Sequence, residues 1–316
     1  MAQLVIVDPI LATEEFDIGP DWLGPDHVIH QPPDFSPEAV WPFLENVEGI
    51  LTAHYPVTAE MIAASSRLLV IAKPGAGYDN IDVAAATARR IPVCNVEGTR
   101  GRSVAEHATF LILHLARHGW MRDDPAWKHT TAYQLGGKTL GIVGLGSAGA
   151  TLARIGHGFG MDIVVNTRTE DPERVPGVPV KFVDRETLLS ESDFVVLCMP
   201  LSPETRNMIN RESLSLMKEK AFLINVSRGP TVNTDDLFEA MKAGHLAGAG
   251  LDVTDPEPLA NDHPLRTLPN VFITPHNAGR THESQAETLG RMADNVRRVL
   301  TGLRPVDIVN PEVLEG

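Results

Sequence analysis

Short apolar, β-branched runs alternate with helical patterns along almost the whole chain, and this alternation limits the possible folds more than any other feature. Continuous apolar strands between helices indicate parallel sheets that are covered on both faces. The pattern therefore predicts an α/β fold with two doubly wound parallel sheets. The first series of expected strands is Leu4–Val7, Gly49–Thr52, Leu68–Ala72 and Val93–Asn95. The second is Thr139–Val143, Ile163–Asn166, Val180–Val183, Phe194–Leu197, Phe222–Asn225, Ala249–Val253 and Val271–Thr274.

The chain length favours two domains. It has 316 residues, and single hydrophobic cores stop growing at about 250–300 residues. We expect residues 1–98 and 284–316 to form a smaller, flavodoxin-like domain, and residues 99–283 a Rossmann-type domain. Segment Ser103–Arg117 is apolar nearly all round, which predicts a helix buried against the second domain or a partner subunit. A last helix, near Glu283–Leu300, carries an apolar stripe and should fold back onto the first domain.

Charge and composition exclude several classes of function. The net charge of −14 argues against binding to nucleic acid or to anionic lipid. The chain has no apolar stretch near ~18 residues, so no membrane span is expected. The two cysteines, Cys94 and Cys198, lie in apolar stretches and are expected to be small buried residues in a reducing compartment. The cytoplasm is the expected location, since no signal-like segment begins the sequence.

A glycine-rich loop opens the second series of strands. It follows the strand at residues 139–143 and precedes a helical pattern at residues 150–159, the order that a dinucleotide-binding loop requires. Glycines let the backbone approach a pyrophosphate, whose charge then faces the helix N-terminus. The residues expected to bind the phosphates are Gly144, Leu145, Gly146, Ser147, Ala148 and Gly149.

The end of the next strand bears on the choice of cofactor. A carboxylate there would accept hydrogen bonds from the adenosine ribose, as in NAD-binding domains. This chain has Asn166, Thr167 and Arg168 instead. A guanidinium can bind a 2′-phosphate, so the sequence favours NADP(H), with NAD(H) remaining possible.

Three polar positions near the end of the second series have the chemistry of a ketone reductase. Reduction of a 2-oxo acid needs a proton donor for the developing alkoxide and a group that holds the substrate carboxylate. His276 is the expected acid and Glu257 its carboxylate partner, while Arg228 offers a bidentate fork for the substrate. All three follow expected strands, at the sheet edge where open α/β sheets bind ligands.

Three other histidines share a helical face. His107, His114 and His118 are spaced by seven and four residues. A metal site is conceivable at that spacing, but packing at the domain boundary is the favoured interpretation.

Taken together, these motifs resemble the D-isomer-specific 2-hydroxyacid dehydrogenases, particularly the glyoxylate and hydroxypyruvate reductase branch. The resemblance covers nearly the whole chain and is carried by KPGAGYDNID (73–82), SVAEH (103–107), GLGSAG (144–149), PLSPET (200–205), NVSRG (225–229), LDV (251–253), PEPL (256–259) and TPHNAG (274–279). It implies a homodimer joined through the nucleotide-binding domains. It also implies the catalytic set Arg228, Glu257 and His276.

The resemblance extends to binding residues. The implied contacts to the cofactor, beyond the loop and residues 166–168, are Pro200, Thr205, Val226, Asp252, His276 and Gly279. The implied contacts to the substrate are Ala76, Gly77, Arg228 and His276, with His54 and Tyr55 as candidates for the substrate tail.

The sequence departs from the family's usual pattern after His276, where it reads NAGRT. Arg280 could then be a second anion-binding group, but an ordinary surface charge is the favoured interpretation. The expected activity is NADPH-dependent reduction of glyoxylate, hydroxypyruvate or a similar short 2-oxo acid to the D-2-hydroxy acid. The alternatives are an NAD-dependent dehydrogenase of another substrate, such as a 3-phosphoglycerate-like one, oxidation of formate or phosphite, and a nucleotide-sensing scaffold.

Overall fold

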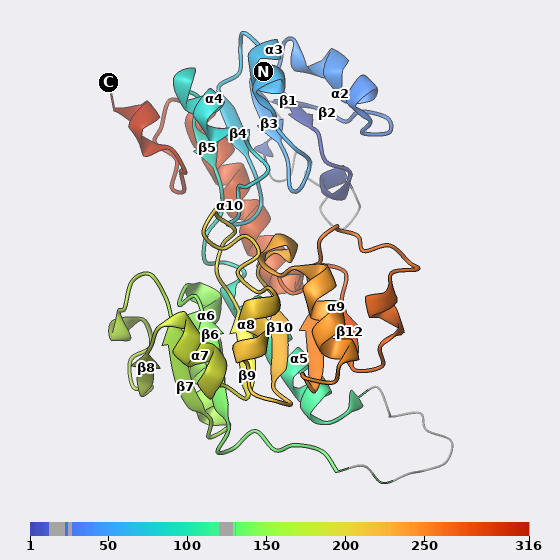
Figure 1. The fold of residues 1–316 in the computed structure, drawn as a ribbon. Helices are drawn as coiled ribbons and strands as arrows, with labels where there is room; N and C mark the ends of the chain where they lie inside the picture. Colours follow the sequence, from blue (N-terminus) through green and yellow to red (C-terminus); the bar gives the residue numbers. More distant parts are fainter. Residues whose placement is uncertain (13–22, 25–26, 120–128, 130, 316) are drawn as a thin grey trace. The chain divides into compact units, whose positions relative to one another are not determined.

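The protein is built from two units, each containing one parallel sheet. The computed structural model describes residues 1–12, 23–24, 27–119, 129 and 131–315. One unit comprises Met1–Thr99 with Thr281–Gly316, and the other comprises Arg100–Arg280. Both sheets carry helices on their two faces (Figure 1), which confirms the predicted fold class.

The first unit contains a five-stranded parallel sheet in the order β2-β1-β3-β4-β5. Its strands are β1 (Ala2–Ile6), β2 (His27–His30), β3 (Gly49–Leu51), β4 (Val70–Ala72) and β5 (Val93–Cys94). Its described helices are α2 (Pro37–Leu44), α3 (Ala59–Ala64), α4 (Val83–Ala88) and α10 (His282–Leu300), with 3-10 turns η1 (Pro9–Ala12) and η6 (Pro311–Leu314).

The period-two geometry of a strand divides this sheet between two cores. Leu4 and Ile6 of β1 belong to the cluster that contains α10. The alternate residue Val5, with Val7 just beyond the strand, belongs to the opposite cluster, to which Val40 of α2 also contributes. A strand buried on both faces has no polar side, which explains why these strands appear as unbroken apolar runs.

Helix α10 covers one face of the first sheet. It begins at Thr281, which forms a capping box with Ser284. Its buried stripe includes Leu289, Met292 and Val296, each at most 3% exposed and packed with residues of β1, β3 and β4. Each such side chain contributes about 1.5–3 kcal/mol on full burial. The helix therefore packs as the apolar stripe in its sequence predicts.

The second unit contains a seven-stranded parallel sheet in the order β12-β11-β10-β9-β6-β7-β8. Its strands are β6 (Thr139–Val143), β7 (Asp162–Asn166), β8 (Val180–Phe182), β9 (Phe194–Leu197), β10 (Phe222–Asn225), β11 (Gly248–Leu251) and β12 (Val271–Ile273). Its described helices are α5 (Gly101–Ala116), α6 (Ser147–Gly158), α7 (Arg185–Glu191), α8 (Arg211–Leu216) and α9 (Thr234–Lys242), with 3-10 turns η3 (Pro172–Arg174), η4 (Gly229–Thr231) and η5 (Pro264–Thr267).

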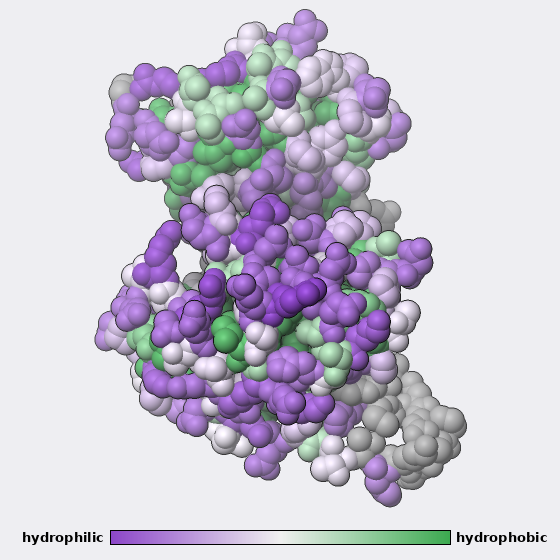
Figure 2. Space-filling view, in the orientation of Figure 1, coloured by the Kyte–Doolittle hydropathy of each residue, from purple (hydrophilic) through white to green (hydrophobic). Residues whose placement is uncertain are grey.

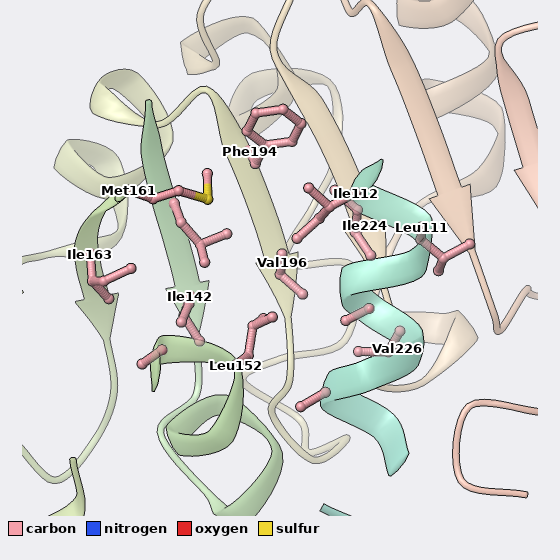
Figure 3. Packing of buried hydrophobic residues seen from close by; sticks show 14 of the residues in the cluster. Leu111, Ile112, Ile142, Leu152, Met161, Ile163, Phe194, Val196, Ile224 and Val226 are labelled. Atoms are coloured by element: carbon pink, nitrogen blue, oxygen red, sulfur yellow. The ribbon is translucent and has the colours of Figure 1, made fainter. Parts of the chain in front are cut away.

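Helices α5 and α6 pack on one face of this sheet. Ile112 of α5 lies near Val196 and Leu152 of α6 lies near Ile142, in one apolar cluster that also contains Leu111 (Figure 3). The other face is covered by α7, α8 and α9 through a separate apolar cluster. Since the sheet is covered on both sides, a ligand can approach its polar backbone groups mainly at the strand ends.

One sequence-based expectation was wrong, and another is met only on one side of a helix. The strand β2 was missed, because its sequence HVIH is short and polar at both ends and all four residues are only half-buried. Helix α5 was expected to be buried against the second domain or a partner subunit, and within this single chain Phe110 is 46% exposed. Leu111, Ile112 and Leu115 face the sheet, so one side of the helix is buried and the opposite side carries an exposed aromatic ring.

The surface agrees with the composition. Hydrophilic side chains cover much of the face shown in Figure 2, with smaller hydrophobic patches between them. Among the helices that the structure describes, none is both long and apolar enough to cross a bilayer.

Candidate active site

The glycine-rich loop joins β6 to α6, and packing requires two of its glycines. Gly144 has a φ of +95°, and a Cβ there would lie 2.9 Å from the backbone of Met199. A Cβ on Gly149 would lie 2.1 Å from the carbonyl oxygen of Gly144. Gly146, the N-cap of α6, has open space where its Cβ would point. The loop therefore packs tightly against the sheet and is open at Gly146, as a loop that receives a phosphate at a helix N-terminus should be.

The end of β7 contacts this loop. The Leu145 amide lies 3.5 Å from Thr167 Oγ1, and Arg174 Nη1 donates to the Leu145 carbonyl at 2.9 Å. Asn166 directs its amide nitrogen elsewhere, to the carbonyl of Val183 at 2.9 Å. The structure thus brings Thr167 to the glycine loop, while the Asn166 donor serves the end of β8.

The turn after β9 lies near the end of β7. Thr205 Oγ1 donates to the Pro200 carbonyl at 2.9 Å and accepts from the Ser202 amide at 2.7 Å. The Ser202 hydroxyl, and to a smaller extent the charge of Arg168, lower the pKa of Glu204. Arg168 is exposed, and its charge is close enough to lower the pKa of a carboxylate on a different loop.

His276 and Glu257 form a hydrogen-bonded pair. Their Nδ1 and Oε1 atoms are 2.6 Å apart, and the side chains are 28% and 42% exposed. His276 has a φ of +53°, and its amide donates to the carbonyls of Asp252, at 2.9 Å, and Thr274, at 3.0 Å. The carboxylate meets the ring at Nδ1, on the opposite side from Nε2. The pair is partly exposed, so a small molecule can reach it.

Arg228 lies in a polar turn after β10. Its carbonyl accepts from Asn225 Nδ2 at 3.0 Å and from Thr231 Oγ1 at 2.6 Å. Its own Nη1 donates to the carbonyl of Ser227 at 2.9 Å. The buried Asn225 and Thr231 side chains fix the backbone from which the guanidinium extends.

The turn that carries Arg228 packs against the segment that leads to Glu257. A Cβ on Gly229 would lie 1.8 Å from the carbonyl oxygen of Thr254, so only glycine allows this approach. Because Gly229 follows Arg228 and Thr254 precedes Glu257 by three residues, the two catalytic candidates stand on adjacent segments.

Asp252 has a structural role that the sequence did not suggest. Its carboxylate is 2% exposed and accepts from Thr274 Oγ1 at 2.6 Å and from the amides of Asn277 and Ala278 at 2.8 and 2.9 Å. His107 Nε2 lies 3.4 Å from the same carboxylate. Burial alone would raise the pKa of Asp252, but the hydrogen bonds from His107, Thr274 and the two amides lower it overall. Asp252 therefore holds the loop that contains His276.

His107 was predicted only to pack at the domain boundary. Its Nε2 lies 2.9 Å from Thr274 Oγ1, a residue 167 positions away in sequence, so it supports the Asp252 network directly. His114 instead contacts the ring of Phe272, with centroids 4.1 Å apart. Spacing along a helix cannot reveal a partner on a distant strand, which is why the pattern gave no signal for His107.

Two further cofactor candidates lie at this sheet edge. Val226 is 9% exposed and packs in the core with Ala278. Gly279 lies against Arg100, whose Cδ would be 2.9 Å from a Cβ at this position. At Val226 the backbone is therefore better placed than the side chain to meet a ligand.

The first unit holds the candidate tail-binding residues. Asp8, which is 3% exposed, accepts with Oδ2 from the amides of Ala53 at 3.1 Å and Tyr55 at 2.7 Å, and from the amide of His54. The His54 side chain is exposed. Burial, and then the charge of Glu38, raise the pKa of Tyr55, so its phenol is a neutral hydrogen-bonding group at ordinary pH.

The neighbouring loop after β4 holds Ala76 and Gly77. Asn95 Nδ2 donates to the Ala76 carbonyl at 2.9 Å, and Asn80 Nδ2 donates to the Tyr55 carbonyl at 2.8 Å. Ala76 is exposed and Gly77 is half-buried. The two loops with predicted substrate contacts are thus connected to each other within the first unit.

Comparison with known proteins places these features in a family. Residues 105–278 match the family model of the D-isomer specific 2-hydroxyacid dehydrogenase, NAD binding domain. The chain is 41% identical over 271 residues to a glyoxylate reductase of Thermococcus litoralis, covering 82% of each chain. It is 36% identical over 301 residues to glyoxylate/hydroxypyruvate reductase B of Klebsiella pneumoniae, covering 90% of this chain and 92% of the relative. A crystal structure of a glyoxylate reductase from Paecilomyes thermophila superimposes with a TM-score of 0.86 at 27% identity, covering 98% and 99% of the two chains.

Proposed function

Since the chain belongs to the D-isomer-specific 2-hydroxyacid dehydrogenase family and is an NAD(P)-dependent oxidoreductase, we propose that it reduces a short 2-oxo acid, of the glyoxylate or hydroxypyruvate type, to the D-2-hydroxy acid. The observation that carries the proposal is the 2.6 Å pair of His276 with Glu257. This pair follows β11 and β12 of a parallel sheet, and the glycine loop follows β6 of the same sheet. The open backbone at Gly146 fits a dinucleotide pyrophosphate.

The reaction requires one hydride and one proton. When bound, a reduced nicotinamide would supply the hydride for the carbonyl carbon of the substrate. His276 donates the proton from Nε2 to the carbonyl oxygen, which becomes the hydroxyl. Glu257 holds the ring through Nδ1 and stabilises the imidazolium that exists before the proton leaves.

Arg228 is the proposed binding group for the substrate carboxylate. A guanidinium can donate two parallel hydrogen bonds, and this both neutralises the carboxylate and fixes its orientation. In the first unit, the backbone around Ala76 and Gly77 remains a proposed substrate contact. The Asp252 carboxylate is assigned to the nicotinamide carboxamide, in addition to its role within the loop.

We propose that the cofactor is preferentially NADPH. Arg168 and Thr167 follow β7, where a 2′-phosphate could receive both a guanidinium and a hydroxyl. Glu204 acts against this preference, since its carboxylate interacts with Arg168. Replacing Arg168 with Gln should therefore lower the ratio of kcat/KM for NADPH to kcat/KM for NADH at least tenfold. Glu204→Gln should raise the same ratio. A higher kcat/KM for NADH than for NADPH in the wild-type protein would contradict the proposed preference.

The central experiment follows absorbance at 340 nm. Glyoxylate, hydroxypyruvate and pyruvate are mixed with protein and with each reduced cofactor, and chiral chromatography determines the configuration of the products formed from hydroxypyruvate and pyruvate. The expected result is oxidation of NADPH with formation of the D-hydroxy acid. Loss of activity in His276→Gln, with unchanged NADPH binding, would support the assigned acid. A wild-type protein that binds NADPH but reduces none of these acids would reject the proposed function.

We also propose a homodimer joined through the second unit. The exposed Phe110 forms ring contacts with His107, His114 and Phe272, which gives an aromatic surface on α5 and β12. Sedimentation should show a dimer for the wild-type protein and a monomer for Phe110→Glu. A monomeric wild-type protein would contradict this proposal.

A further inference from the structure

Arginines from three separate segments gather in the second unit. Arg100 is the N-cap of α5, Arg228 follows β10, and Arg280 ends the turn that follows His276. The Arg280 amide donates to the carbonyl of Asn277 at 2.8 Å, which closes a turn over residues 277–280, directly after His276. Arg280 is half-buried.

The side chain of Arg100 lies along the turn that leads to Arg280. A Cβ at Gly279 would lie 2.9 Å from Arg100 Cδ and 3.4 Å from its Cβ. The glycine therefore provides the space that the Arg100 stem occupies. This contact brings the Arg100 guanidinium to the segment that carries the proposed acid His276.

The three charges influence one another. Burial, then the charge of Arg280, and then that of Arg228 lower the pKa of Arg100 to about 10. The guanidinium still carries its full charge at neutral pH. Its Nε is buried, with no hydrogen-bond partner in the part of the chain that the structure describes. A buried donor of this kind costs stability unless it meets an acceptor, and the neighbouring like charges add to that cost.

We propose that Arg100 and Arg280 form a second anion subsite beside Arg228, which selects 2-oxo acids with an additional acidic group. One fork on Arg228 is enough for the carboxylate of glyoxylate, so two more guanidiniums exceed what a monoanion can neutralise. A second carboxylate, sulfonate or phosphate would supply the acceptor that Arg100 Nε lacks. In a protein with a net charge of −14, local positive charge is also what would attract a dianion.

This proposal rests on the proposed function and names its substrate class. The main competing explanation is that Arg100 binds the cofactor. A Cβ on Gly101 would lie 1.9 Å from Ser147 Oγ, so the start of α5 also meets the glycine loop. The experiment must therefore separate substrate binding from cofactor binding.

Kinetics with matched substrates test the subsite. Glyoxylate and hydroxypyruvate are compared with oxaloacetate, 2-oxoglutarate, 3-sulfopyruvate and 3-phosphohydroxypyruvate, which distinguish the acidic groups. The wild-type protein should prefer at least one dianion. Arg100→Gln and Arg280→Gln should reduce the dianion-to-glyoxylate ratio of kcat/KM about 10- to 100-fold, the effect of losing one hydrogen bond to a charged group. Arg185→Gln, an exposed charge at the start of α7, should leave the ratio unchanged.

Three outcomes would overturn the subsite. They are a wild-type protein without preference for any dianion, variants that lose monoanion and dianion activity equally, and variants in which the Kd for NADPH rises as much as the dianion activity falls. Calorimetry with malonate and acetate, in the presence of NADP⁺, tests the subsite even if no oxo acid is reduced. Tighter binding of malonate that Arg280→Gln abolishes would support it, and equal affinities would reject it. Absence of turnover with intact malonate selectivity would reject the proposed function alone.

Discussion

Replacing Asp252 with Asn tests whether one buried carboxylate fixes the loop that carries His276. The asparagine has nearly the same shape, but one carboxylate oxygen becomes an NH₂ group. That group must face either the Ala278 amide or the Thr274 and Asn277 donors, which lie 2.6–2.9 Å from the native oxygens. At least one acceptor is lost and the remaining one is neutral.

The expected cost follows from these contacts. A hydrogen bond to a charged group contributes about 1.5–3 kcal/mol, and a donor left unsatisfied costs about 1–3 kcal/mol. Losing one such bond and weakening the others predicts a fall of about 3 kcal/mol or more in the free energy of unfolding of the second unit. Since whole domains have stabilities of about 5–15 kcal/mol, the loss should be large and easily measured.

The pH dependence gives an independent measure. The pKa of Asp252 is lowered in the folded protein, so the unfolded state binds the proton more tightly. Its contribution is therefore complete well above the unfolded value of about 3.9 and is lost as pH falls through the lower folded value. In Asp252→Asn, the free energy of unfolding should therefore fall less between neutral and acidic pH than it does in the wild-type protein.

Urea unfolding at neutral and acidic pH, together with hydrogen exchange of the Asn277 and Ala278 amides, measures both effects. The matched control is Asp262→Asn, which removes one exposed carboxylate from the same unit. If Asp252→Asn unfolds within about 0.5 kcal/mol of this control and both amides keep their protection, the carboxylate does not hold the loop.

Other predictions concern the catalytic set and the glycine loop. Arg228→Lys should raise KM strongly and lower kcat, because a point charge cannot replace a bidentate fork, and wild-type kinetics would exclude Arg228 from the mechanism. Glu257→Gln should lower kcat and shift the pH dependence of kcat/KM. An unchanged pH profile would show that the pairing with Glu257 does not set this pH dependence. Gly149→Ala should disrupt cofactor binding and stability, since its Cβ would lie 2.1 Å from the Gly144 carbonyl oxygen. Gly146→Ala has open space and should fold normally but bind NADPH more weakly, as calorimetry and thermal unfolding can show. Equal stability losses in both alanine variants would contradict this distinction.

The sequence predicted the fold well because the strands are buried on both faces. Each strand therefore appears in the sequence as a short apolar run. Phe194–Leu197 and Phe222–Asn225, for example, have the bounds that were predicted. The same reasoning failed for His27–His30, because an edge strand with half-buried polar ends resembles a loop. Some other predicted strands ran one or two residues past the observed end, as Val93–Asn95 and Ala249–Val253 did, whereas Ile163–Asn166 began one residue late.

The sequence predicted the pairing of His276 with Glu257 but not the contacts that support it. His276 and Glu257 were assigned from their order in the chain, and the structure shows them paired. The contacts of Asp252 with His107 and of Gly279 with Arg100 join segments that are far apart in sequence. Such contacts depend on how α5 packs beside the sheet, and the periodicity of the sequence does not predict this packing.

The placement of α10 has a consequence during protein synthesis. Residues 1–99 leave the ribosome long before this helix, so the face of β1 and β4 that it covers stays exposed to water until α10 has been synthesised. The second unit is continuous in sequence, so its core can form before α10 is synthesised. A chain whose translation stops after the second unit and before α10 should therefore expose Leu4, Ile6 and Val70 to chaperones. An added peptide with the sequence of α10 should bind this face and cover them.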